Sequence, residues 1–308
     1  MAVFGKLVAV TAGLGAAVVA GAWAEARAFG VVFHQLTLPW PDGTRPRLRV
    51  LHVSDTHYRR GQHAKAQFLS LLAVSQPDLV VMTGDLVADD DSLDEFLDAI
   101  DGLLQCQGVF VRGSNDYFGP TAVNPFGYLV RAPGQARRPD GQKLQWRRLR
   151  DALLDAGWHD LDNAAAQLNI AGQAVTLRGT NDAHIDLDNY DAVSGGTPQG
   201  LLIGVTHAPY RRVLAAMAAD NVALVLAGHT HGGQICLPGR ALVTNCDLPP
   251  SMAKGLHRWP GEAPSLWLHV SAGVGTSPNF PLRLFCRPEA CIIEINSELN
   301  DLGFACDL

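Results

Sequence analysis

Five short segments of this chain place metal-ligand residue types directly after apolar, β-rich runs. They are Asp55-Thr56-His57, Gly84-Asp85, Gly113-Ser114-Asn115-Asp116, Thr206-His207 and Gly228-His229-Thr230-His231. Loops that follow parallel strands meet at the carboxyl edge of a sheet, so residues far apart in the sequence can converge there. Carboxylates and imidazoles together suit two small divalent metal ions, and a pair of such ions suits hydrolysis of phosphate esters. The pattern therefore constrains both the fold and the chemistry of the chain.

Strand-like and helix-like segments alternate, which predicts βαβ units and an α/β fold with sheets covered by helices. The expected strands are residues 31–38, 48–53, 79–82, 108–112, 167–170, 174–178, 201–205, 222–226, 266–270 and 291–295. The expected helices are residues 64–75, 92–104, 145–156 and 211–219. Ser92 followed by Glu95 predicts a capping box at the start of the second helix. Residues 124–140, rich in Pro, Gly and Arg, predict a surface excursion or lid.

Composition excludes some classes of partner and site. The 308 residues are 47% hydrophobic, which is enough for a sizeable core, and the net charge is −6. This charge and the lack of a long basic run argue against binding to a nucleic-acid backbone. The six cysteines form no C-x-x-C pair, which argues against a structural zinc site. Five of them lie in the last third and could pair in an oxidising compartment or remain buried free thiols.

The amino terminus differs from the rest of the chain. Lys6 precedes residues 7–23, an uncharged run rich in Ala, Gly and Val. This length is at the short end for a membrane span, and an uncleaved anchor is the preferred interpretation. Ala22-Trp23-Ala24 also fits a signal-peptide cleavage site, and a buried helix is the third alternative. We expect a membrane anchor or signal segment over residues 1–28, a linker and edge strand over 29–47, and one catalytic domain over 48–308. The protein would then be membrane-associated or exported. The sequence does not determine on which side of the membrane the catalytic domain lies.

The ligand segments differ in how specific they are. Asp55 and His57 lie two apart, so in an extended strand their side chains would share one side. Asp85 could bridge two ions, because Gly84 lets the backbone come close. His229 and His231 alternate within a glycine-rich loop, which is a poor place for core histidines, and they can face two neighbouring metals.

Taken in order, these motifs resemble the calcineurin-like metallophosphoesterase family from about residue 48 to residue 295. The sequence is most similar to a bacterial branch with an amino-terminal membrane segment. Gly-His-Thr-His-Gly-Gly-Gln and a late Cys-Arg-Pro-Glu recur in that branch. The resemblance implies a two-sheet β sandwich flanked by helices, in four αββα layers, and two divalent ions, Mn, Zn or Fe. It implies ligands to one ion (Asp55, His57, His231), ligands to the other (His207, His229) and a bridge (Asp85).

One loop departs from the family pattern of Gly-Asn-His-Asp or Gly-Asn-His-Glu. Here it is Gly113-Ser114-Asn115-Asp116, so either Ser114 or Asn115 falls on the position of the second ion's last ligand. Asn115 is preferred because an amide oxygen is the better donor. In either register the family's histidine general acid is missing. A metal-bound water, Asp116 or His184 must then protonate the leaving group, and esters with acidic leaving groups should react best.

The resulting hypothesis is a dinuclear phosphodiesterase or phosphatase that uses a metal-bridging hydroxide. Its phosphate-ester substrates could be lipid or envelope-linked, given the membrane segment. The alternative, motivated by the irregular loop, is a metal-binding module of the same fold that has lost catalysis. A metal-dependent amidohydrolase is disfavoured, because such enzymes carry His-x-His early and this chain carries it late.

Overall fold

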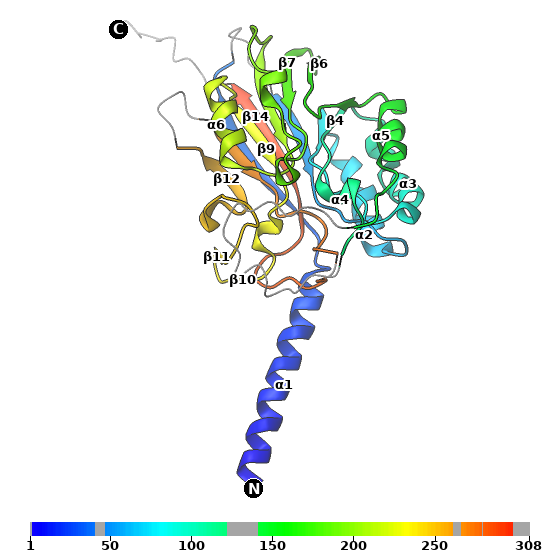
Figure 1. The fold of residues 1–308 in the computed structure, drawn as a ribbon, viewed down its shortest axis with the longest axis vertical. Coiled ribbons are helices and arrows are strands. Elements are labelled where there is room, and N and C mark those ends of the chain that lie inside the picture. The colour runs from blue at the N-terminus through cyan, green and yellow to red at the C-terminus, as the bar shows by residue number, and fades with distance from the viewer. Residues whose placement is uncertain (1, 41–46, 122–140, 261–265, 279, 298–308) are drawn as a thin grey trace, which may run out of the picture.

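The structure, a computed structural model, describes residues 2–40, 47–121, 141–260, 266–278 and 280–297, without the side chains of residues 2–12 and 14. Two six-stranded sheets pack face to face, and helices cover their outer faces (Figure 1). The predicted two-sheet α/β architecture is therefore confirmed. The predicted excursion at residues 124–140 lies outside the described residues.

The first sheet holds the amino-terminal half of the site. Its strands, in spatial order, are β1 (Gly30–Leu38), β14 (Glu289–Ser297), β2 (Arg47–Val53), β3 (Leu79–Met82), β4 (Gly108–Phe110) and β5 (His159–Asp160). Strands β2 to β5 are parallel, while β14 runs antiparallel to β2. The carboxyl ends of β2, β3 and β4 therefore lie along one edge.

The second sheet holds the other half of the site. Its strands, in spatial order, are β12 (Gly255–Arg258), β13 (Trp267–Val270), β9 (Leu224–Ala227), β8 (Leu201–Thr206), β7 (Gln173–Gly179) and β6 (Ala165–Ile170). Strands β7, β8, β9 and β13 are parallel to one another. A short hairpin, β10 (Cys236–Leu237) with β11 (Arg240–Ala241), lies outside both sheets.

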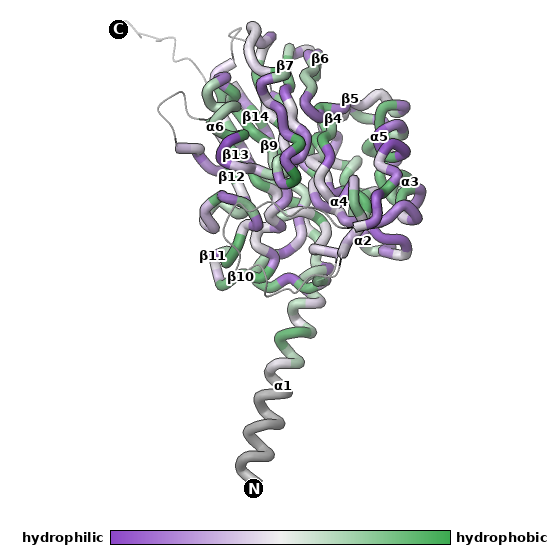
Figure 2. Tube along the Cα trace, viewed as in Figure 1, coloured by the Kyte–Doolittle hydropathy of each residue, from purple (hydrophilic) through white to green (hydrophobic). Residues whose placement is uncertain are grey.

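Alternating side chains along the strands build separate apolar layers. In β3, Leu79 and Val81 face the core between the sheets, while Val80 and Met82 face the helices. The helices are α2 (His63–Leu71), α3 (Leu93–Leu104), α4 (Ser114–Tyr117), α5 (Trp146–Asp155) and α6 (Arg211–Ala219). Apolar side chains of α2, α3 and α5 pack on the first sheet, and those of α6 pack on the second. Helices α3 and α5 carry apolar and hydrophilic bands, as expected of helices with one buried face (Figure 2).

The start of α3 differs from the prediction. Ser92 makes no side-chain cap bond to the helix and instead donates to the carboxylate of Asp89. Glu95 accepts from the Tyr58 hydroxyl and from the backbone N–H of Gly61. The predicted capping box is therefore wrong, because tertiary partners take both side chains.

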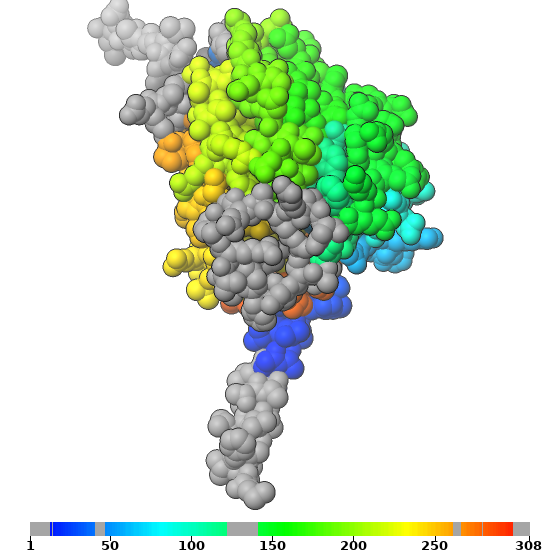
Figure 3. Space-filling view, in the orientation of Figure 1, coloured from blue at the N-terminus to red at the C-terminus, as the bar shows by residue number. Residues whose placement is uncertain are grey.

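Helix α1 (Ala2–Glu25) leaves one end of the body (Figures 1 and 3). Its last turns are docked there: the carboxylate of Glu25 accepts from the N–H groups of Phe285 and Cys286, and the carbonyl of Ala22 accepts from the N–H of Arg283. Within the described residues, no helix combines the length and apolar character needed to cross a membrane. Part of the expected anchor at residues 7–23 falls on side chains outside that description, so the anchor stays a prediction.

A buried ion network below the Gly113 loop supports the first sheet. Arg112 pairs with Asp160 at 3.0 Å and Asp162 at 2.5 Å, and its Nε donates to the Tyr117 hydroxyl. Its side chain is 6% exposed. We expect Arg112→Met to lower the free energy of unfolding by about 3–5 kcal/mol, because it leaves the buried Asp162 carboxylate without its cation. Urea unfolding of the full chain measures this loss.

The pH dependence of that loss has a defined sign. Burial raises the pKa of Asp162 to about 6 even beside Arg112, so the folded state holds the proton more tightly than the unfolded chain does. The variant should therefore regain stability as the pH falls from 7 toward 5. Arg47→Met, at an exposed pair with Glu294, is the control and should cost far less at either pH. Equal losses for the two variants would contradict the assignment.

Candidate metal centre

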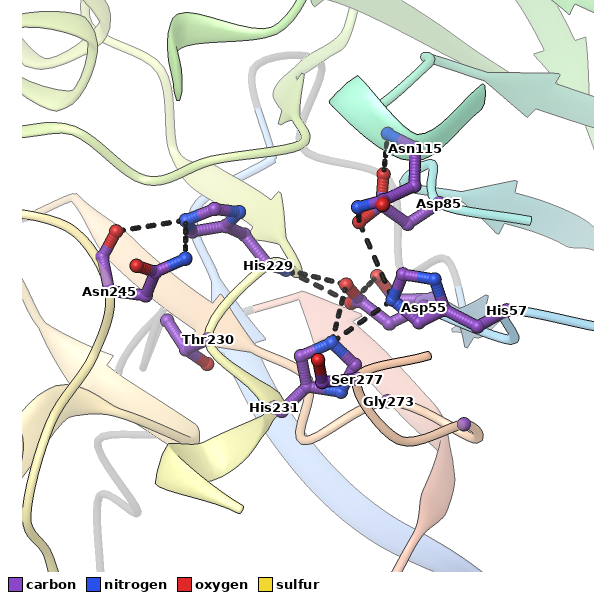
Figure 4. A network of polar contacts seen from close by, with 12 residues as sticks. Asp55, His57, Asp85, Asn115, His229, Thr230, His231, Asn245, Gly273 and Ser277 are labelled. Atoms are coloured by element: carbon purple, nitrogen blue, oxygen red, sulfur yellow. Dashed lines mark hydrogen bonds and ion pairs between the residues drawn. The ribbon is translucent and has the colours of Figure 1, made fainter. Parts of the chain in front are cut away.

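The predicted ligand segments meet at one edge of the two packed sheets. Asp55 and His57 follow β2, Asp85 follows β3, and Asn115 is the second residue of α4, which follows β4. From the second sheet, His207 follows β8, and His229 and His231 follow β9. Figure 4 shows Asp55, His57, Asp85, Asn115 and His231 close together, with the His229 ring to one side of them. The predicted convergence of strand-end loops therefore holds.

Most of the candidate ligands have a left-handed backbone conformation. Five of the candidate ligands have positive φ: Asp55 (49°), His57 (37°), Asp85 (54°), His229 (70°) and His231 (50°). Non-glycine residues adopt this conformation rarely, and such residues concentrate at functional sites. The expectation that Asp55 and His57 share a side through strand alternation is wrong, since β2 ends at Val53. Tight turns bring them together instead.

Asp55, His57 and His231 form the first ligand group. Their donor atoms lie within 4.8 Å of one another. The Nε2 atoms of His57 and His231 are 3.1 Å apart, and His231 Nε2 is 3.7 Å from the carboxylate of Asp55. Burial lowers the pKa of His57 to about 4 and that of His231 well below its ordinary value. Both imidazoles are therefore neutral near pH 7, which is the form that binds metals.

Asp55, Asp85 and His207 form a second group on the same distance criterion. His207 Nδ1 lies 2.6 Å from the carbonyl of Thr83, which fixes the proton on that nitrogen. Its Nε2 is fully buried, 3.6 Å from Asp85, and has no hydrogen-bond partner. Burial lowers the pKa of His207, but the carboxylates of Asp85, Asp182 and Asp55 raise it to about 10. The raised pKa shows that the surrounding carboxylates favour positive charge at His207. A divalent cation bound at the unpaired Nε2 would supply that charge.

Asp85, a member of the second group, also approaches the first. Its Oδ2 is 3.5 Å from His57 Nε2 and 3.6 Å from His207 Nε2, so one oxygen faces histidines of both groups. A Cβ atom at Gly113 would lie 2.2 Å from the other oxygen of Asp85 and 2.7 Å from the His207 ring. Only glycine permits this approach.

His229 lies farther from the carboxylates. Its Nε2 is 3.1 Å from the carbonyl of Asn245, and its ring centroid is 5.2 Å from that of His207. It belongs to neither group of close donor atoms, and its role as a ligand stays a prediction. Its backbone N–H donates to the carboxylate of Asp55, which ties the two loops together.

The Gly113 loop places Asn115, not Ser114, beside the carboxylates. Asn115 donates to Asp85 from both its backbone N–H (2.8 Å) and its amide Nδ2 (2.7 Å), as Figure 4 shows. Asp116 is fully buried and accepts from the N–H groups of Gly113, Asp85 and Leu86. These bonds give Asp116 a positioning role, and its role as a proton donor stays a prediction.

His184 lies beside His229 and is 9% exposed. Its ring centroid is 4.5 Å from that of His229, and its Nδ1 is 3.0 Å from the hydroxyl of Tyr210. This buried position makes it a better candidate for proton transfer than a surface loop would.

Sequence reasoning missed Asp182. It is fully buried, one of its oxygens has no hydrogen-bond partner, and burial raises its pKa to about 7. The signal available was its place in the polar loop directly after a strand. Its carboxylate adds to the negative field around His207.

Comparison with known proteins identifies the family of the chain. Residues 48–233 match the family model described as calcineurin-like phosphoesterase. The chain is 26% identical to phosphodiesterase YaeI of Escherichia coli, over 87% of this chain and 88% of that protein. It is 23% identical to the uncharacterized metallophosphoesterase YkoQ of Bacillus subtilis, over 86% of this chain and 90% of that protein. Among solved structures, purple acid phosphatase PPD1 from yellow lupin (Lupinus luteus) aligns with a TM-score of 0.41 at 11% identity, over 86% of this chain and 56% of that one.

Proposed function

The chain belongs to the calcineurin-like phosphoesterase family and is a phosphoric ester hydrolase, and we propose that it cleaves phosphodiesters with two divalent ions. The observation that carries this proposal is the position of Asp85, whose one oxygen faces histidines of both ligand groups. A carboxylate so placed can bridge two ions. Asp55, His57 and His231 would hold one ion, and His207, His229 and Asn115 the other.

The residues around the ligands fix their geometry. Two ions at this site would supply the Lewis acidity that activates water and neutralises charge on the phosphate. Thr83 fixes the tautomer of His207, and the Ser54 hydroxyl donates to Asp55 at 2.5 Å. These partners orient the ligands before any substrate binds, and such support typically changes metal affinity or activity by about 10–100-fold.

A substrate and metal screen of the full chain tests the function. We expect metal-free protein to regain hydrolysis of bis-p-nitrophenyl phosphate with Mn, Zn or Fe, and to prefer this diester to p-nitrophenyl phosphate. The relative named phosphodiesterase supports that preference. Binding of two ions without turnover of any mono- or diester would favour the alternative, a metal-binding module. Turnover that survives complete chelation would contradict both.

We also propose that the end of the body carrying α1 lies against a membrane. Exposed apolar side chains gather there: Val18, Val19 and Trp23 on α1, Leu237 on the β10 hairpin, and Phe285. Apolar and Trp side chains at one end suit the interface of a bilayer. Phospholipid vesicles should carry the full chain upward in a flotation gradient, and Trp23→Glu with Phe285→Glu should reduce this. Leu187→Glu, at another exposed apolar residue, is the control. Full-length protein that does not float would refute the proposal.

A further inference from the structure

A second cluster of metal-ligand residue types lies between the two sheets, outside the site described above. Strand alternation turns His34 of β1, His52 of β2, Cys291 of β14 and His269 of β13 toward the same interior. The neighbours two residues away on these strands, such as Leu36, Val50 and Ile293, belong to the apolar core between the sheets. Where these four residues lie, the space between the sheets is therefore lined by histidine and thiol groups instead of apolar side chains.

Three of these side chains converge on one point. Donor atoms of His34, His269 and Cys291 lie within 4.8 Å of one another. The rings of His34 and His269 are 5.0 Å apart between centroids. Tetrahedral zinc, with bonds of about 2.0–2.1 Å to nitrogen and about 2.3 Å to sulfur, places ligand atoms about 3.3–3.8 Å apart. Small side-chain adjustments would bring the three atoms to that separation.

One nitrogen of the cluster lacks a partner. His269 is fully buried, its Nδ1 lies 2.9 Å from Nδ1 of His52, and its Nε2 has no hydrogen-bond partner. A buried polar atom without a partner is costly and rare, so it calls for an occupant. Glu289 lies nearby and accepts from the Cys291 thiol at 3.7 Å, which adds a negative charge. His34 is only half-buried, which gives an ion a path inward.

We propose that His34, His269 and Cys291 bind a third divalent cation of the zinc type, separate from the phosphoesterase centre. Two imidazoles and one thiolate make a borderline-soft donor set, which suits zinc better than manganese. Burial and the nearby Glu289 raise the pKa of the Cys291 thiol, so binding of the cation displaces the thiol proton into solvent. Glu289 or a water molecule can complete the tetrahedron.

The site is connected to the phosphoesterase centre by a chain of buried hydrogen bonds. His269 contacts His52, whose Nε2 lies 2.8 Å from the Thr83 hydroxyl. Thr83 donates to Ser54 at 2.7 Å, and Ser54 donates to Asp55. A cation on His269 Nε2 fixes that ring and the bonds that follow it. The third ion therefore orients Asp55 from a distance.

Cobalt binding to the metal-free full chain tests the proposal. The phosphoesterase ligands include no sulfur, so a thiolate-to-cobalt charge-transfer band in the near ultraviolet reports this site alone. We expect one band-forming equivalent per chain, displaced by added zinc. The absence of the band would overturn the proposal even if the enzyme hydrolyses phosphodiesters, and its presence in an inactive protein would still support it.

Matched variants identify the ligands. Cys291→Ser should abolish the band, whereas Cys106→Ser and Cys286→Ser, which alter thiols outside the cluster, should retain it. His34→Gln changes a half-buried strand position and leaves the Cys291 thiol in place. It should weaken cobalt binding at least about tenfold. Circular dichroism of each metal-free variant separates loss of ligand from loss of fold. A band that persists in folded Cys291→Ser would overturn the assignment.

Discussion

Asp85→Asn is expected to lower kcat for phosphodiester hydrolysis by more than the about 10²–10³-fold that loss of one transition-state contact costs. Asparagine has the same shape, but its amide NH₂ replaces an acceptor oxygen. It would then face the two N–H donors of Asn115 and the nitrogens of His57 and His207 with fewer lone pairs and no charge. In the proposed centre both ions share this residue, so the variant should also bind fewer ions.

Metal analysis and steady-state kinetics of the same preparation decide the result. Asp91→Asn, at an exposed position of the same segment, is the control and should leave both ion content and rate unchanged. A variant that retains two ions and wild-type kcat would show that Asp85 does not bridge. Far-ultraviolet circular dichroism should show that the metal-free variant is folded.

The fold was predictable because its strands are short apolar runs with both faces buried. Residues 79–82 and 201–205 could be read as strands directly, and the loops after them were correctly expected to converge. Boundaries at helix starts were less predictable. Ser92 and Glu95 carry a local capping pattern, yet their partners come from Asp89, Tyr58 and Gly61, which only the tertiary fold brings near.

The site was predictable as a set of strand-end ligands, but not in its geometry. Alternation was the wrong reason for grouping Asp55 with His57, since both have positive φ, which no residue pattern announced. Asp182 was missed because its one signal, a place in the polar loop after a strand, is shared by many Asp residues that only cap turns.

The cluster of His34, His269 and Cys291 between the sheets was still harder to predict from the sequence. Zinc sites are often recognised in a sequence by C-x-x-C pairs, and this chain has none. His34, His269 and Cys291 are brought together only by the pairing of β1 with β14 and the packing of β13 against them. The available signal was a polar residue at a core-facing strand position, such as His52 in an apolar run, and it required knowing which face was buried.

His184→Gln is expected to separate substrates by their leaving groups. If His184 protonates the departing oxygen, the variant should lose about 10²–10⁴-fold on diesters with alkyl leaving groups. It should lose little on bis-p-nitrophenyl phosphate, because p-nitrophenolate leaves without a proton. The prediction rests on the burial of His184 and on its contacts with His229 and Tyr210.

The dependence of log kcat on leaving-group pKa distinguishes the two candidate donors. His184→Gln should steepen that dependence, while His159→Gln, at an exposed histidine, should leave it unchanged. Asp116→Asn should lower the rate equally for all leaving groups, because its carboxylate holds the backbone of Gly113, Asp85 and Leu86. If Asp116→Asn steepens the dependence and His184→Gln does not, the donor is Asp116 and His184 serves to position His229.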